Sequence, residues 1–125
     1  MNAIDLFAGC GGLSRGFMDA GFDVLLGVDN DTAALKTFSL NHKGAKAINT
    51  DLSAETAFEV IRNEIDHKKV DVIIAGPPCQ GFSLTGPRNV DDERNKLYLA
   101  VFKAVKELSP RAFVIENVIG MATLY

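Results

Sequence analysis

The chain has 125 residues, of which 47% are hydrophobic and 23% are charged. This length suits one domain, and this composition supplies a hydrophobic core and argues against a disordered chain. No apolar run approaches the roughly 20 residues of a membrane span, and no basic segment followed by an apolar one marks a secretory leader. The two cysteines, Cys10 and Cys79, lack metal-ligand spacing, so we expect a reducing, cytoplasmic location and no metal site.

Acidic and basic residues nearly balance, with 13 Lys and Arg against 16 Asp and Glu, and a net charge of −3. A domain that binds nucleic acid strongly by itself usually has clustered basic residues. Arg88, Arg94 and Lys96 are the local exceptions. Charge alone is as consistent with an ordinary solvated loop there as with a loop that contacts nucleic acid.

Short apolar runs alternate with helical patterns along the chain. In chain order, the predicted elements are a strand at 3–7, a helix at 13–20, a strand at 24–28, a helix that Asp31 or Thr32 caps and that ends near 41, a strand at 46–49, a helix that Ser53 caps, a strand at 70–75, a helix at 97–108 and a strand at 112–115. This alternation predicts an α/β fold, in which helices cover both faces of a parallel sheet. Right-handed crossovers limit the topology to a Rossmann-like half.

A glycine-rich turn, residues 9–12 (GCGG), lies between the first predicted strand and helix. Glycines let the backbone approach a ligand, and a helix N-terminus offers free N–H groups, although such a turn also simply permits tight packing. Asp29 ends the second strand about 20 residues later, where an acidic side chain can accept both ribose hydroxyls. Ser14 stands where a dinucleotide fingerprint has its third glycine. This departure favours S-adenosylmethionine over a dinucleotide.

Asp51 follows the third predicted strand at the same edge of the sheet. Its carboxylate could accept a hydrogen bond from an adenine amino group. The alternative is that residues 51–53 form only a turn and a helix cap.

Cys79 follows a Pro-Pro pair directly after the fourth predicted strand, within residues 76–95, which we expect to form a long irregular loop. Loops of that length in compact domains are usually functional or mobile, and ligands bind at this edge of open α/β sheets. A free cysteine is often an inert core residue, but this position is a poor one for core packing. We therefore predict that Cys79 is a nucleophile, which acts as its thiolate, and that Cys10 is the inert cysteine.

Glu116 ends the fifth predicted strand, which we expect beside the fourth, so that Glu116 and Cys79 face the same cleft. Because it follows an apolar strand directly, Glu116 is expected to be partly buried and suited to donate or share a proton. The alternative is a structural carboxylate that is tied to neighbouring backbone or to Arg111.

Three segments together resemble a known family. Residues 5–12 (DLFAGCGG), 76–83 (GPPCQGFS) and 116–118 (ENV) are similar to the cofactor, catalytic and third signature motifs of DNA (cytosine-5)-methyltransferases, and they occur in that family's order. The chain resembles the N-terminal part of the catalytic domain over essentially its whole length. The resemblance implies a Rossmann-like S-adenosylmethionine-dependent methyltransferase fold, present here as a partial domain.

The resemblance implies a set of S-adenosylmethionine-binding residues, with Asp29 on the ribose, Asp51 on the adenine amino group and Phe7 packed against the cofactor. The full implied set is Phe7, Ala8, Gly9, Cys10, Gly11, Gly12, Asp29, Asn30, Asp51, Leu52, Pro78 and Leu97. Asn30 is polar where some family members have a large apolar side chain against adenine.

The resemblance also implies a mechanism and a substrate. Cys79 would attack C6 of a cytosine flipped out of double-stranded DNA, and Glu116 would bind its N3 and N4 edge. C5 would take the methyl group, and loss of the C5 proton and of Cys79 would release 5-methylcytosine and S-adenosylhomocysteine. Gln80, Ser83 and Arg88 would contact DNA. The family's bacterial members serve restriction–modification systems.

The family's arginine-bearing strand, target-recognition region and final cofactor-pocket helix do not fit within 125 residues. We therefore expect a fragment of a longer enzyme, or one subunit of a split enzyme with a C-terminal partner chain, that is inactive or nearly so alone. Three alternatives are an RNA cytosine-5 methyltransferase on the same catalytic core, a NAD-dependent oxidoreductase, which would leave Cys79 and Glu116 without a role, and a non-catalytic binding relic.

Overall fold

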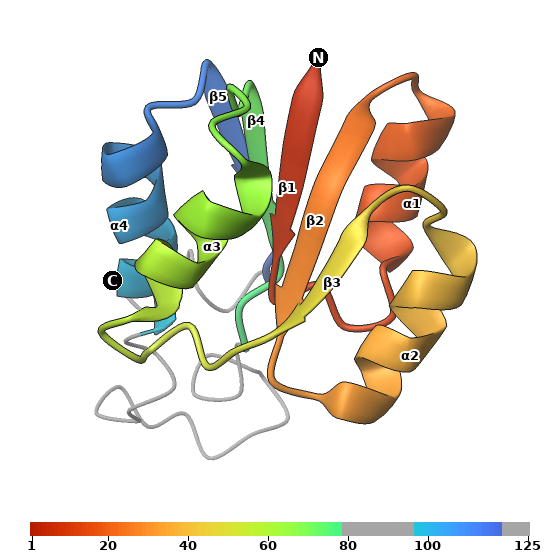
Figure 1. The fold of residues 1–125 in the computed structure, drawn as a ribbon, viewed down its shortest axis with the longest axis horizontal. Helices are drawn as coiled ribbons and strands as arrows, with labels where there is room; N and C mark the ends of the chain where they lie inside the picture. Colours follow the sequence, from red (N-terminus) through yellow and green to blue (C-terminus); the bar gives the residue numbers. More distant parts are fainter. Residues whose placement is uncertain (79–96, 119–125) are drawn as a thin grey trace.

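Five parallel strands form one sheet in the order β3-β2-β1-β4-β5 within the part of the chain that the computed structural model describes, residues 1–78 and 97–118 (Figure 1). In chain order, the elements are β1 (Asn2–Leu6), α1 (Gly12–Asp19), β2 (Asp23–Asp29), α2 (Thr32–Asn41), β3 (Lys46–Asn49), α3 (Ala57–Ile65), β4 (Val72–Ala75), α4 (Leu97–Leu108) and β5 (Ala112–Ile115). The predicted α/β fold with a parallel sheet is confirmed.

Helices cover both faces of the sheet, with α1 and α2 on one face and α3 and α4 on the other (Figure 1). Side chains alternate along β1 because successive residues of a strand point to opposite faces. Ile4 and Leu6 belong to the core cluster that includes Ile61 of α3 and Val101 of α4. Ala3 belongs to the second cluster, with Phe38 of α2. Two cores therefore hold the central strand from both sides.

The starts of three elements test the sequence interpretation in detail. Asp31, one of the two proposed caps of α2, accepts hydrogen bonds from the amides of Ala33 at 2.8 Å and Ala34 at 3.1 Å. The prediction that Ser53 caps α3 is wrong, since α3 follows Thr56 and Ser53 instead donates its hydroxyl to Asp51 at 2.7 Å. The amide of Ala54 donates to the carbonyl of Asp51, and the amide of Ala57 donates to the carbonyl of Ala54. These turns occupy the segment after Ser53, so the helix begins later in the chain than expected. β4 begins at 72 rather than 70.

Strand β5 forms an edge of the described sheet and is more exposed than the other strands. It pairs with β4 in parallel, as expected from the chain order. Phe113 and Val114 are 45% and 43% exposed, and the ring of Phe113 meets that of Phe102 on α4, which is also exposed. An apolar edge strand of this kind is usually covered or extended in a complete domain.

None of the helices within residues 1–78 and 97–118 combines the length and the apolar composition that crossing a membrane requires. The cytoplasmic location expected from the sequence stays a prediction.

Gly27 in β2 gives a direct test of the packing between the sheet and α2. A Cβ added to Gly27 would lie 2.5 Å from ring atoms of Phe38, which is fully buried. We expect Gly27→Ala to lower the free energy of unfolding by about 1–3 kcal/mol, the usual cost of overpacking a core. Urea unfolding measures this change.

Gly16→Ala is the matched control for Gly27→Ala. Gly16 lies within α1, and an added Cβ there would meet nothing within 4 Å. Alanine is a better helix former than glycine, so this variant should be neutral or gain up to about 1 kcal/mol. Equal stability of the two variants would contradict the packing described here.

Candidate active site

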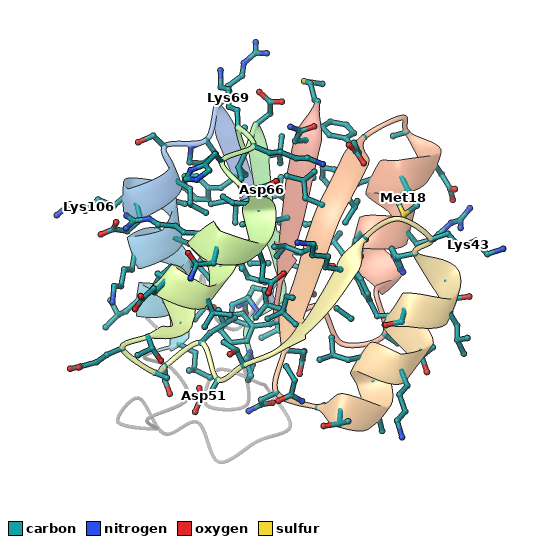
Figure 2. All side chains as sticks on the ribbon, in the orientation of Figure 1. Met18, Lys43, Asp51, Asp66, Lys69 and Lys106 are labelled. Atoms are coloured by element: carbon teal, nitrogen blue, oxygen red, sulfur yellow. The ribbon has the colours of Figure 1, made fainter. Side chains whose placement is uncertain are left out.

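A cavity of about 140 Å³ lies at the carboxyl ends of the parallel strands, the edge at which ligands bind in open α/β sheets. Figure 2 shows Asp51 at this edge of the molecule. The cavity combines apolar side chains with two carboxylates. Its lining residues are Phe7, Asp29, Asn30, Thr50, Asp51, Leu52, Gly76, Pro78 and Leu97. Seven of these belong to the predicted cofactor set. Thr50 and Gly76 do not, although Thr50 directly precedes Asp51 and Gly76 begins the predicted catalytic motif.

Asp29, at the end of β2, joins the glycine-rich turn to the cavity. Its Oδ2 accepts a hydrogen bond from the amide of Gly9 at 2.8 Å, and its Oδ1 accepts one from the amide of Asp31 at 2.9 Å. Each carboxylate oxygen has two lone pairs, so one remains on each oxygen for a ligand hydroxyl. Asp29 is therefore oriented by backbone amides and still able to accept two hydrogen bonds from a ribose.

Phe7 reaches the cavity through an unusual backbone conformation. Its φ is +59°, in the left-handed region that bulky residues rarely adopt and that clusters at functional sites. The next residue, Ala8, donates its amide to the carbonyl of Val28 at 3.0 Å, which holds the chain in this conformation. Nothing in the sequence pattern predicts the left-handed turn at Phe7.

The other predicted residues of the turn, 8–12, are not among those that line the cavity. Gly9 and Gly12 border open space, where an added Cβ would meet nothing within 4 Å, and Cys10 is exposed. Gly11 is different, because it has a φ of +88° and packs against side chains of α2. Contact between these residues and a cofactor stays a prediction.

Asp51 forms the turn that the sequence left as one alternative, and it also borders the cavity. Its Oδ1 accepts hydrogen bonds from the amide of Ser53 at 2.8 Å and from the Ser53 hydroxyl at 2.7 Å, which form the turn. These bonds hold the pKa of the Asp51 carboxyl below its usual value. Asp51 also lines the cavity, so the turn orients a charged carboxylate toward it without excluding a binding role.

Glu116 lies beside the start of the Pro-Pro segment, as expected, but is not buried. Its amide donates to the carbonyl of Ala75 at 2.8 Å, and its Oε2 lies 3.8 Å from the position of a Cβ on Gly76. The expectation of a partly buried carboxylate is wrong: Glu116 is exposed, because it follows the exposed edge strand β5. No ion pair joins it to Arg111 in the part of the chain that the structure describes.

Asn117 has a role that the sequence interpretation missed. Its side-chain amide hydrogen-bonds to the hydroxyl of Tyr98, a buried residue of α4, and its Oδ1 accepts from the amide of Val118 at 2.7 Å. Asn117 therefore ties the end of β5 to α4 and fixes the segment that follows Glu116. A polar residue in the second position after a strand was the only signal for it.

Four predicted site residues lie outside the described residues: Cys79, Gln80, Ser83 and Arg88. Their roles stay predictions. Within 1–78 and 97–118, no three His, Cys, Asp or Glu side chains are grouped so that they could hold a metal ion.

Asp5 is a buried carboxyl on β1 that the site prediction did not include. It is 1% exposed, and its Oδ2 has no hydrogen-bond partner within the described part of the chain. Burial raises the pKa of Asp5 to about 7; the polar groups of the nearby Ser14 oppose this shift, and the charge of Asp29 adds to it. An acidic residue in an otherwise apolar strand was the signal that could have identified it.

The raised pKa of Asp5 predicts how stability changes with pH. The folded state holds its proton up to about pH 7, whereas the unfolded state releases it near pH 4, so stability falls as the pH rises between these values. The loss is about 4 kcal/mol at most, from a shift of roughly three units. Denaturant unfolding at pH 4 and pH 8 should therefore show that Asp5→Asn loses less stability than the wild type over this interval.

Asp23→Asn removes an exposed carboxylate at the start of β2 and serves as the control. Its stability should follow the wild-type pH dependence. A wild-type and an Asp5→Asn profile that run parallel from pH 4 to pH 8 would contradict the assignment.

Comparison with known proteins identifies the family. The sequence model of the C-5 cytosine-specific DNA methylase family matches residues 1–125. The Type II methyltransferases M.AgeI of Thalassovita gelatinovora and M.DdeI of Desulfomicrobium norvegicum are 45% and 44% identical to the chain, and each match covers 99% of the chain. Both matches cover 29% of the relative, so the chain spans less than a third of the length of these relatives.

Solved structures agree with this assignment. A putative DNA modification methyltransferase encoded within an E. coli prophage is 43% identical, with a TM-score of 0.82 over 97% of this chain and 33% of that protein. The S. pombe Dnmt2 methyltransferase, at 24% identity, shares the fold with a TM-score of 0.69 over 98% of this chain and 38% of that protein. The chain belongs to the C-5 cytosine-specific DNA methylase family.

Proposed function

We propose that this chain supplies the cofactor-binding and catalytic part of an enzyme that methylates C5 of cytosine in DNA. The observation that supports the proposal is the cavity at the carboxyl ends of the strands, where Phe7, Asp29 and Asp51 lie together. Glu116 adjoins Gly76, another lining residue. The family assignment removes the oxidoreductase alternative, since the matching family transfers methyl groups to cytosine.

The lining residues fit S-adenosylmethionine in their chemistry. Phe7, Leu52, Pro78 and Leu97 offer apolar surface for an adenine ring. Asp29 has free lone pairs for ribose hydroxyls, and Asp51 is a charged acceptor for an exocyclic amino group. Asp29, Asp51 and Phe7 would therefore hold the nucleoside. When bound, S-adenosylmethionine supplies the methyl group that C5 of cytosine accepts.

The chemistry at the base would fall to Cys79 and Glu116. The Cys79 thiolate would form a bond to C6 of a cytosine flipped out of the duplex, and the electron pair displaced from the C5–C6 double bond would make C5 nucleophilic. Glu116 would bind the N3 and N4 edge and stabilise the charge that the addition develops. Loss of the C5 proton and expulsion of the thiolate would restore the aromatic ring and leave 5-methylcytosine. Gln80, Ser83 and Arg88 would contact the DNA.

We propose that this chain acts together with a further segment, either in the same polypeptide or in a partner chain. The chain spans less than a third of M.AgeI and M.DdeI, and its net charge of −3 is unsuited to strong DNA binding. The exposed apolar edge at Phe113 and Val114 offers a surface that such a segment could cover. Alone, the chain should bind DNA weakly and methylate it slowly or not at all.

Covalent capture tests this function. The completed enzyme, with this chain joined to its missing part, is incubated with S-adenosylmethionine and a duplex that contains 5-fluorocytosine at the target position. Fluorine cannot leave C5 as a proton does, so the thiolate adduct should persist on a denaturing gel. We expect Cys79→Ala to abolish capture and to leave cofactor binding within about twofold of the wild type, since removal of a thiol that contacts only the base costs little cofactor affinity.

Cys10→Ala is the matched control: Cys10 belongs to the implied cofactor set and is not assigned to chemistry at the base, so this variant should still be captured when S-adenosylmethionine is saturating. An RNA duplex of the same sequence separates the RNA alternative from the DNA proposal. Undiminished capture by Cys79→Ala, or capture that Cys10→Ala abolishes, would contradict the assignment of the nucleophile.

A further inference from the structure

Tyrosine aside, three polar side chains are buried within the described residues, and all three lie near the glycine-rich turn. They are Asp5 on β1, Ser14 on α1 and His42 at the end of α2, each at most 1% exposed. Buried polar groups are costly unless they are hydrogen-bonded, and satisfied networks of such groups fix one arrangement of the surrounding chain. Their concentration behind one turn indicates that this turn is held in place by specific contacts.

The ring of His42 packs directly on Gly11. A Cβ added to Gly11 would lie 2.2 Å from Cε1 of His42 and 2.7 Å from Cδ2 of Phe38. The two rings are parallel, with centroids 4.0 Å apart, and come from positions four residues apart on α2. Helix α2 therefore presents a stacked pair of rings to the turn, and only glycine at position 11 leaves room for it.

The hydrogen bonds of His42 determine which ring nitrogen holds the proton. Nδ1 lies 2.9 Å from the carbonyl oxygen of Phe38, which can only accept, so Nδ1 is the donor. In the neutral ring, Nε2 is then an acceptor, and it lies 3.1 Å from the hydroxyl of Ser14. The carbonyl of Gly11 is the other acceptor near that hydroxyl, at the longer distance of 3.3 Å.

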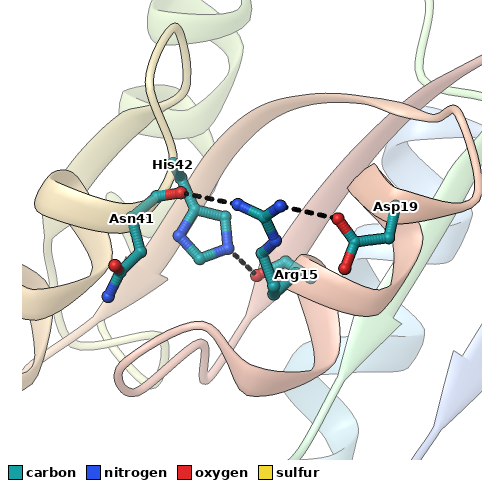
Figure 3. Close-up of polar contacts among 5 residues, drawn as sticks. Arg15, Asp19, Asn41 and His42 are labelled. Carbon is teal, nitrogen blue, oxygen red and sulfur yellow. Dashed lines mark hydrogen bonds and ion pairs between the residues drawn. The ribbon is translucent and has the colours of Figure 1, made fainter.

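A second contact between α1 and α2 lies outside this network. Arg15 donates to the carbonyl of Asn41 at 3.4 Å and forms an ion pair with Asp19 at 2.7 Å, as Figure 3 shows beside the contact of His42. Arg15 and Asp19 are more than half exposed, and exposed ion pairs of this kind stabilise little. The specific connection between the helices is therefore the buried pair Ser14–His42.

We propose that Ser14 and His42 are positioning residues, which hold the glycine-rich turn in the shape that the cofactor site needs. The turn is fixed at two points: Asp29 holds the amide of Gly9, and the Ser14–His42 pair holds α1 and Gly11 against α2. Both Phe7 and Asp29 line the cavity. Asp29 accepts the hydrogen bond from the amide of Gly9, and Phe7 lies two residues before Gly9 in the chain. This inference rests on the proposed function for its link to S-adenosylmethionine.

Amide hydrogen exchange of the chain, measured by NMR without any ligand, tests whether the Ser14–His42 pair holds the glycine-rich turn in position. The amides of Gly9 and Gly11 donate to Asp29 and to the carbonyl of Ala8, so their exchange reports the shape of the turn. We expect Ser14→Ala to speed their exchange about tenfold, the effect of one lost net hydrogen bond. The amide of Ile74 in the buried strand β4 should keep its wild-type rate. The His42 ring should show protonated Nδ1 and unprotonated Nε2 in long-range ¹H–¹⁵N spectra.

Two further variants distinguish a local effect on the glycine-rich turn from a general loss of folding stability. Ser39→Ala removes a hydroxyl of α2 that bonds to Leu35 of its own helix, so it should leave the turn unchanged. His42→Gln keeps a side-chain acceptor for the Ser14 hydroxyl, whereas His42→Leu does not. The Gly11 amide should therefore exchange more slowly in His42→Gln than in His42→Leu. Turn amides that exchange at the wild-type rate in Ser14→Ala, or uniform loss of protection that includes Ile74, would overturn the proposal.

Calorimetric titration with S-adenosylmethionine links the bracing to the cofactor. We expect Ser14→Ala to weaken binding about tenfold and Ser39→Ala to change it less than twofold. Unchanged affinity in Ser14→Ala, when the wild type binds, would overturn the link to the cofactor. If the wild type itself does not bind, the chain alone does not form the proposed cofactor site, and the exchange experiment still decides whether the Ser14–His42 pair holds the turn.

Discussion

Parallel pairing of β1 with both of its neighbours brings together three residues that line the candidate site. Leu6, the last residue of β1, is paired with Val28 of β2 on one side and with Ala75 of β4 on the other. The residues that follow these three positions, Phe7, Asp29 and Gly76, therefore meet at one edge, and all three line the cavity. Residues nearly 70 positions apart in the sequence become neighbours because three strands end at the same level.

The central position of β1 also explains the buried carboxyl at Asp5. Ile4 and Leu6 face the core cluster formed with α3 and α4, so Asp5, which lies between them in β1, faces the opposite side of the sheet. There it lies close to Ser14 in the first turn of α1. Burial makes its ionised form costly. The polar residues Ser14 and His42 lie on the same side of the sheet and are buried as well, so this face combines an apolar core with a polar cluster directly behind the glycine-rich turn.

The sequence predicted the parallel sheet, the place of the fifth strand beside the fourth and most element boundaries, because apolar periodicity and glycine-rich turns depend on local sequence. It also predicted cavity residues at or just beyond the ends of strands, such as Asp29, Asp51 and Pro78. It did not predict features that depend on packing between distant segments. The left-handed backbone of Phe7 and the stacking of Phe38 with His42 against Gly11 have no signal in spacing.

Two predictions failed for related reasons. Ser53 was expected to cap a helix from its residue type, but hydrogen bonds between residues 51, 54 and 57 form turns first. Glu116 was expected to be partly buried from the apolar strand before it, but β5 lies at the edge of the described sheet. In both cases the predicted helix or strand forms, but the contacts of the neighbouring residue differ from those expected.

The proposed nucleoside site for S-adenosylmethionine lies at the carboxyl edge of this sheet, with Asp29 as the ribose acceptor. Calorimetric titration of the chain with S-adenosylmethionine, with NAD as the control ligand, tests it most directly. The account predicts one-to-one binding of S-adenosylmethionine, no binding of NAD, and at least about tenfold weaker binding in Asp29→Ala, the effect of losing hydrogen bonds to a charged group. Binding of NAD instead, or S-adenosylmethionine affinity that Asp29→Ala leaves unchanged, would contradict it.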